Sequence, residues 1–100
     1  MTLYVLSRRA RLDLDEIWDY TSERWGSDQA EQYIRMIRAG LETAAAQPMI
    51  GAPCDHIHPG YRKYPVGSHV FFYRIIDKGI DVARVLHARM DFGRHVRVMH

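Results

Sequence analysis

The sequence predicts an α+β fold: one short strand, a helical hairpin and a three-stranded antiparallel meander. Apolar residues recur at three- and four-residue steps through residues 8–46, as they do on one face of a helix. Residues 61–88 instead form three short runs rich in β-branched and aromatic side chains, with turn residues between them. The apolar run at residues 2–6 predicts a strand ahead of the helices.

The first helix is expected to begin after Ser7, whose side-chain oxygen can accept hydrogen bonds from the free amides of the first turn. Gly26 is expected to end it. Its predicted apolar face consists of Ala10, Leu14, Ile17, Trp18, Thr21 and Trp25. The two tryptophans are therefore expected to pack in the core or within the hairpin.

The second helix is expected to begin directly afterwards, with Ser27 as its cap and Asp28 in its first turn, and to end before Pro48. Its predicted apolar face consists of Ala30, Tyr33, Ile34, Ile37, Leu41, Ala44 and Ala45. Because almost no chain separates the two helices, they are expected to lie antiparallel.

Residues 47–60 are rich in proline and glycine and are expected to form a loop. The strands are expected at 61–66, 69–76 and 80–88, joined by turns at Gly67-Ser68 and at 77–79. The tail 91–98 is expected to form one or two helical turns, with Asp91 as the cap.

The two-residue turn fixes the register of the first two strands of the meander. It pairs Val66 with His69, Tyr64 with Phe71 and Arg62 with Tyr73, so a cation–π contact between Arg62 and Tyr73 is expected. Side chains alternate between the two faces of a strand, and both faces of 69–76 carry apolar residues. The helical hairpin can cover one face, so the C-terminal tail or a partner is expected to shelter part of the other.

Composition limits the class of protein. A chain of 100 residues with 47% apolar and 26% charged residues is expected to form one globular domain, residues 1–100. Its apolar runs are shorter than the ~20 residues that cross a bilayer, and the N-terminus has no pattern of a signal peptide. The single cysteine, Cys54, fits a reducing cytoplasm, so we expect a cytoplasmic protein without a membrane partner.

The charge is uneven along the chain although the net charge is only +2. Residues 84–100 contain four arginines and one carboxylate, Asp91, which gives +3 with neutral histidines. A basic C-terminal part of this kind favours an acidic partner, either nucleic acid or protein, over a small neutral ligand. A solvated charged surface explains the same pattern.

Several segments resemble the ParE branch of the RelE/ParE toxin superfamily of type II toxin–antitoxin modules. These segments are DLDEIWDYTSERWGSDQAEQYI (13–34), QPMIG (47–51), PGYRKYPVGSHVFFYRI (59–75) and VARVLHARMDFGRHV (82–96). The resemblance implies a fold in which the first strand joins the meander in one sheet. It also implies a small cytoplasmic toxin that is neutralised by a cognate ParD-like antitoxin. ParE members inhibit DNA gyrase, whereas RelE relatives cut messenger RNA.

The alternative function is that of an endoribonuclease, and the residues of this chain can be compared with the groups that RNA cleavage requires. RNA cleavage without a metal needs a base, an acid and cations around the phosphate. Arg62, Arg74, Arg84 and His87 are the candidates for these roles, with His87 as base or acid. However, Val70 stands near the start of the central strand, where many RelE-type nucleases have an arginine. We therefore expect a binding protein rather than an enzyme.

The residues expected to bind the target lie in the basic C-terminal part: Arg84, His87, Arg89, Met90, Asp91 and Arg94. Arg62 and Arg74, together with the outward edges of both helices, are expected to bind the antitoxin. Operator DNA is expected to be contacted only through the antitoxin. A non-toxic relative that binds its antitoxin and helps to repress their shared promoter is a further alternative.

No cofactor is expected. Cys54, His56 and His58 alternate in the loop, but a closed zinc site usually takes four ligands and often two cysteines. We therefore expect an exposed loop there rather than a metal site.

Overall fold

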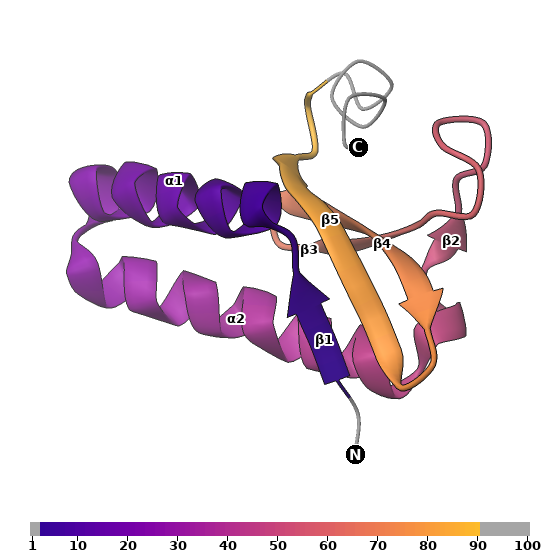
Figure 1. Cartoon of the computed structure of the whole chain (residues 1–100). Helices are drawn as coiled ribbons and strands as arrows, with labels where there is room; N and C mark the ends of the chain where they lie inside the picture. The colour runs from indigo at the N-terminus through magenta and orange to yellow at the C-terminus, as the bar shows by residue number, and fades with distance from the viewer. Residues whose placement is uncertain (1–2, 91–100) are drawn as a thin grey trace.

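The computed structural model describes residues 3–90 and confirms the predicted α+β fold (Figure 1). Strand β1 (Leu3–Leu6) leads into helices α1 (Arg8–Trp25) and α2 (Ser27–Ala46), which form the predicted hairpin. Strands β3 (Arg62–Val66), β4 (His69–Ile76) and β5 (Gly79–His87) follow. The predicted helical turns at 91–98, and with them Asp91 and Arg94, lie outside the described residues.

The loop at 47–60 contains two short elements that the sequence analysis did not predict. Pro48–Ile50 forms a 3₁₀ turn, η1, and Ala52–Pro53 forms a two-residue strand, β2, which pairs with β3. The sheet order is therefore β1-β5-β4-β3-β2, with β1 parallel to β5 and the other pairs antiparallel. Gly79 has to be glycine at the β1–β5 contact, because a Cβ there would lie 1.7 Å from the carbonyl oxygen of Leu3.

The predicted register of the β3–β4 hairpin is confirmed, with Val66 opposite His69 and Arg62 opposite Tyr73. Its consequence for Arg62 differs from the prediction. The guanidinium donates hydrogen bonds to the carbonyl oxygens of Gly51 (2.6 Å) and Met49 (3.3 Å), and the Tyr73 hydroxyl donates to Pro48 (2.7 Å). Both side chains therefore hold the loop after α2, and the pairing is not the expected cation–π contact.

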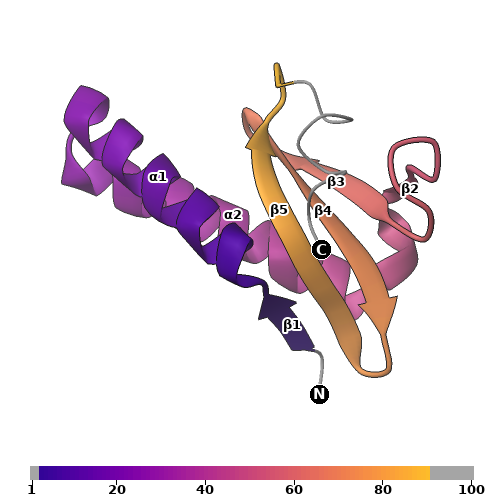
Figure 2. The ribbon, with the colours of Figure 1, turned by 45° about the horizontal axis from the view of Figure 1, so that its top comes forward.

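The two faces of the sheet are covered by different segments. The helical hairpin packs on one face around Phe71 and Tyr73 and runs on beyond the sheet (Figures 1 and 2). On the other face, Cys54 and Tyr61 form a second buried cluster with Phe72 and strand β5. The loop that precedes β3 thus supplies part of the cover that was expected from the tail or from a partner.

The tryptophans are more exposed than predicted. Trp25 is 67% exposed at the end of α1 and Trp18 is 37% exposed, whereas Ala10 and Ile17 are buried. The buried stripe of α1 also includes Asp13, at three residues from Ala10 and four from Ile17.

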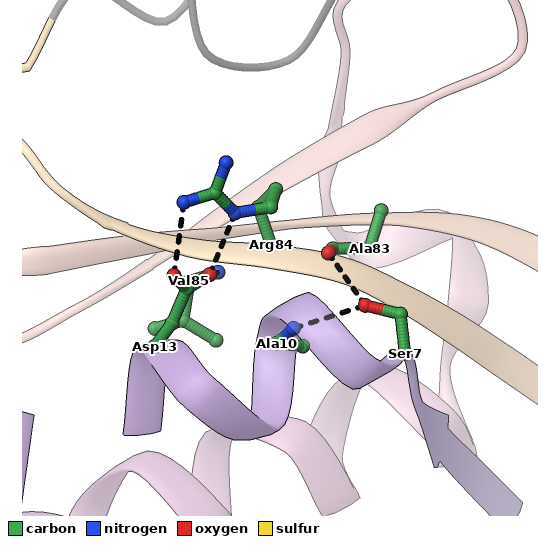
Figure 3. Close-up of polar contacts among 6 residues, drawn as sticks. All are labelled: Ser7, Ala10, Asp13, Ala83, Arg84 and Val85. Carbon is green, nitrogen blue, oxygen red and sulfur yellow. Dashed lines mark hydrogen bonds and ion pairs between the residues drawn. The ribbon is translucent and has the colours of Figure 1, made fainter. Parts of the chain in front are cut away.

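Asp13 connects α1 to β5 through a buried ion pair. Its carboxylate accepts hydrogen bonds from Nε (2.8 Å) and Nη2 (2.9 Å) of Arg84 and from the amide of Val85 (2.9 Å) (Figure 3). The Ser7 hydroxyl, which caps α1 by accepting from the Ala10 amide, donates to the carbonyl oxygen of Ala83 (2.8 Å). Hydrogen bonding to Asp13 raises the pKa of Arg84 above its ordinary value.

The contacts of Ser7 and Asp13 with β5 begin where the pairing of β1 with β5 ends. Strand β1 covers Gly79 to Val82, and a register shift between β4 and β5 follows directly at Ala83. Side chains of Ser7 and α1 then replace the neighbouring strand as partners of the β5 backbone. Such replacement is needed because a buried backbone group without a hydrogen bond costs about 1–3 kcal/mol.

Because the Asp13–Arg84 ion pair is buried, Asp13→Ala is expected to lower the stability of the fold strongly. The substitution leaves the Arg84 charge buried and removes the acceptor of the Val85 amide, so the free energy of unfolding is expected to fall by about 3–5 kcal/mol. Urea unfolding measures this. Adding Arg84→Met should restore part of the loss, because it removes the unpaired charge. A loss below about 1 kcal/mol for Asp13→Ala would show that the pair does not hold α1 on the sheet.

Candidate functional site

Two hollows meet between α1 and the C-terminal end of β5, and together we call them the edge groove. The first, of about 540 Å³, is lined by Asp13, Glu16, Ile17, Tyr20, Thr21, His69, Arg84, Val85, Leu86, His87 and Met90. The second, of about 390 Å³, is lined by Tyr20, Thr21, Trp25, Gln29, Tyr33, Ser68, His69 and His87. The hollows share four lining residues. Asp13 ties α1 to β5, and the C-terminal part of the helix runs outward past the sheet (Figure 2).

A cluster of three ring side chains, Tyr33, His69 and His87, forms one end of the edge groove. The Tyr33 hydroxyl accepts from the Ser68 amide (2.9 Å) and is hydrogen-bonded to Nδ1 of His69 (2.6 Å), to which it donates when the proton of a neutral His69 is on Nε2. The ring centroids of His69 and His87 are 5.3 Å apart. Nδ1 of His87 accepts from the Arg89 amide (3.1 Å), so the proton of a neutral His87 is on Nε2.

Electrostatics keep His69 uncharged. Burial, with a smaller contribution from the neighbouring His87, lowers the pKa of His69 from 6.5 to about 4. The more distant Asp13 carboxylate acts in the opposite direction. At neutral pH the Tyr33–His69 pair therefore links α2 to the β3–β4 turn through an uncharged hydrogen bond.

A second concave surface, which we call the hairpin groove, lies between the two helices beside β1. It has a volume of about 500 Å³ and is lined by Tyr4, Leu6, Arg11, Leu14, Asp15, Trp18, Ile34, Arg38 and Leu41. Most of these side chains are apolar, and Arg11, Arg38 and Asp15 supply the charges. A surface of this kind suits an amphipathic protein segment better than a small polar substrate.

The candidate arginines have separate intramolecular contacts. Arg84 is 5% exposed and paired with Asp13, which leaves it little surface for a target or an antitoxin. Arg74 forms an ion pair with Asp81 (3.0 Å) and keeps an exposed side chain, whereas Arg62 holds the carbonyl oxygens of the loop after α2. Arg84 is thus part of the internal framework, a different role from the partner contact that the sequence predicted.

The structure also separates the four residues of the nuclease alternative. Arg62 faces the helices opposite Tyr73, and Arg74 follows Tyr73 on β4 and so faces the other way. His87 lies at the far end of β5, next to His69. These residues do not converge on one point that a phosphate would occupy.

His87 and Met90, which were predicted to bind the target, line the edge groove, and the exposed Arg89 lies between them in the chain. Their role in target binding stays a prediction. Tyr33, Thr21 and Tyr20 also line the edge groove, and the sequence analysis missed them. Tyr33 was assigned to a core face, although its hydroxyl gave a signal that its tip needs a polar partner. Among residues 3–90, no group of three or more His, Cys, Asp or Glu side chains has the arrangement of a metal site.

The fold and the grooves define a small α+β protein with two concave surfaces, both lined by residues of α1. The sequence profile described as "ParE toxin of type II toxin-antitoxin system, parDE" matches residues 4–92. The chain belongs to this family of toxins. No helix within residues 3–90 is long and apolar enough to cross a membrane.

Relatives support the assignment. Toxin ParE1 of Mycobacterium tuberculosis is 55% identical over 94 residues, which are 93% of this chain and 96% of the relative. Toxin ParE1 of Caulobacter vibrioides is 44% identical over 96 residues, covering 96% and 99% of the two chains. A chain of the chromosomal ParDE toxin–antitoxin system from P. aeruginosa has the same fold, with a TM-score of 0.75 and 22% identity over 87% of this chain and 96% of that chain.

The lowered pKa of His69 predicts a loss of stability in acid. The unfolded chain binds a proton at His69 near pH 6.5 and the folded chain only near pH 4, so the unfolded state holds more protons between these values. The free energy of unfolding is therefore expected to fall as the pH decreases from 6.5 to 4.

His69→Gln should flatten this part of the pH dependence, since glutamine does not titrate. Urea unfolding at several pH values measures the effect, with His56→Gln, at an exposed loop position, as the matched control. Equal slopes for the wild-type chain and His69→Gln would contradict the assignment.

Proposed function

We propose that the chain inhibits DNA gyrase by binding it and that a ParD-like antitoxin neutralises the chain in the cytoplasm. Family membership supports a toxin, and the relatives carry toxin names rather than names of enzymes. The ParDE system among the solved structures supports a ParD-like partner. The proposed mechanism is the poisoning of a DNA-cleaved gyrase complex, with no chemical step performed by this chain.

The observation that carries binding rather than catalysis is the separation of the candidate catalytic residues. Arg62, Arg74 and Arg84 contact loop carbonyls, Asp81 and Asp13 respectively, at different places on the sheet. Stabilising a phosphate transition state requires donors that already converge on one site. The grooves beside α1 instead present apolar surface framed by charges, which is a common basis for holding a protein.

We assign the target to the C-terminal part of the chain. His87 and Met90 line the edge groove and the exposed Arg89 lies between them in the chain, which supports this assignment. Asp91 and Arg94 follow outside the described residues and stay predictions for the same interface. Arg84 contributes by fixing β5 rather than by contact. Basic side chains beside an apolar groove favour an acidic protein surface as the complement.

We assign the antitoxin to the helical hairpin. The hairpin groove offers Trp18 between two arginines, Arg11 and Arg38, and suits an amphipathic antitoxin helix with acidic residues. Arg74 remains a candidate contact because its side chain is 56% exposed. Arg62 is a weaker candidate because its guanidinium already holds two carbonyl groups. Operator DNA would be reached through the antitoxin.

Purified toxin is expected to inhibit supercoiling by gyrase and to leave cell-free translation unaffected. The two assays are run side by side at equal toxin concentration. Blocked translation with unaffected supercoiling would favour the endoribonuclease, and His87→Ala would then be expected to stop transcript cleavage. If expression causes no growth arrest and supercoiling is unaffected, the chain acts only with its antitoxin at their promoter.

Trp18→Ala is expected to weaken antitoxin binding at least about tenfold, since tryptophans in the centre of an interface commonly carry much of the binding energy. Isothermal titration calorimetry with the purified antitoxin measures the change. Met49→Ala is the matched control, because it truncates an exposed apolar side chain on η1, away from the hairpin groove. Equal affinities for both variants would place the antitoxin elsewhere.

A further inference from the structure

Among residues 3–90, the backbone of β5 has one hydrogen-bonding position without a partner, at residues that line the edge groove. The pairing of Val70 with Leu86 and the hydrogen bond from the Ala88 amide to the Ser68 carbonyl (2.9 Å) direct Leu86 and Ala88 toward β4. By alternation, the backbone groups of Val85 and His87 point away from β4. Strand β1 cannot reach them, because its pairing with β5 ends at Val82.

Two of these four outward groups already have partners. The Val85 amide donates to Asp13 (2.9 Å), and the His87 carbonyl accepts from the Met90 amide (2.9 Å). Within residues 3–90, the structure gives no hydrogen bond to the Val85 carbonyl or to the His87 amide. One acceptor and one donor are thus left, on either side of Leu86.

This remaining pair selects the direction of an added strand. An antiparallel neighbour would need both groups of Val85 or both groups of His87, and each residue has one group occupied. In a parallel ladder, one incoming residue donates to the residue before its partner and accepts from the residue after it. A parallel segment with one residue opposite Leu86 would therefore bind the Val85 carbonyl and the His87 amide together.

The walls of the groove suit the side chains of such a segment. Ile17 of α1 and Met90 after β5 give the groove apolar lining, and Thr21 gives it a small side chain. The nearby charge of Asp13 is neutralised by Arg84, and His69 is held neutral by burial. Arg89 is exposed and lies in the chain between two groove-lining residues, His87 and Met90, so it supplies a cation next to this lining. The complementary occupant is an extended segment with apolar side chains and an acidic neighbour.

We propose that an extended, apolar segment of the toxin's protein target docks parallel to β5 in the edge groove, with one residue bound between the Val85 carbonyl and the His87 amide. This inference rests on the proposed function, because the groove lies within the part of the chain assigned to the target. The segment continues the line of β1, which also runs parallel to β5. Main-chain hydrogen bonds supply the binding, and the groove selects the side chains.

Hydrogen exchange at single amides tests the docking directly, with the full chain alone and with purified DNA gyrase as the probe. The His87 amide is expected to exchange rapidly in the free toxin and at least about tenfold more slowly in the complex. The Val85 amide is the internal reference, since Asp13 binds it in both states. An unprotected His87 amide in a formed complex would overturn the proposal, and so would a His87 amide already protected in the free chain, where residues 91–100 would be its occupant.

A matched pair of arginine substitutions tests the groove walls. Thr21→Arg fills the edge groove and is expected to weaken gyrase binding at least about tenfold, whereas Thr43→Arg adds the same side chain at an exposed position of α2 and should change it less than about twofold. Thermal unfolding shows whether both variants fold. Loss of antitoxin binding instead of gyrase binding in Thr21→Arg would assign the groove to the antitoxin and overturn the proposal.

The two proposals fail in different ways. A wild-type chain that neither binds nor inhibits gyrase overturns the proposed function, and the docking inference falls with it. A wild-type chain that inhibits gyrase without protection of the His87 amide overturns the docking inference alone.

Discussion

The structure depends on the way in which α1 completes the edge of β5. Strand β1 pairs with only the first part of β5, and beyond it the Ser7 hydroxyl and the Asp13 carboxylate bind the backbone at Ala83 and Val85. The carboxylate can be buried because Arg84 neutralises it through two hydrogen bonds. Helix α1 is thereby fixed to the sheet, and its residues line both the edge groove and the hairpin groove.

The proposed target site lies beyond the contacts of Ser7 and Asp13 with β5. The C-terminal part of α1 runs outward beyond the sheet (Figures 1 and 2). The last residues of β5 line the edge groove, and the pairing of β1 with β5 does not extend to them. The Tyr33–His69 hydrogen bond closes the far end of that groove without adding a charge. The target is proposed to bind in the edge groove and the antitoxin in the hairpin groove, which α1 also lines. Because α1 forms a wall of both grooves, antitoxin bound to the hairpin groove could alter the edge groove through this shared helix.

Much of the fold was predictable from local signals, and the site was predictable only in part. The Gly67-Ser68 turn fixed the register of β3 and β4, since a two-residue turn allows one pairing. The Asp13–Arg84 pair joins residues 71 positions apart, which no local pattern specifies. Arg84 was interpreted as surface because a count of charges along the chain does not report burial. Asp13 was not assigned to the apolar face of α1, although its spacing from Ala10 and Ile17 puts it on the buried stripe, where a carboxylate requires a cation.

The central claim is that this toxin acts by holding its target and not by altering it, and the reversibility of inhibition tests that claim most directly. Gyrase is inhibited with increasing amounts of purified toxin, and excess antitoxin is then added while supercoiling is followed. The account predicts that inhibition requires toxin in amounts comparable to gyrase and that supercoiling returns once the antitoxin has removed the toxin. Lasting inactivation by a small fraction of an equivalent of toxin would contradict it, because only a catalyst acts in that way.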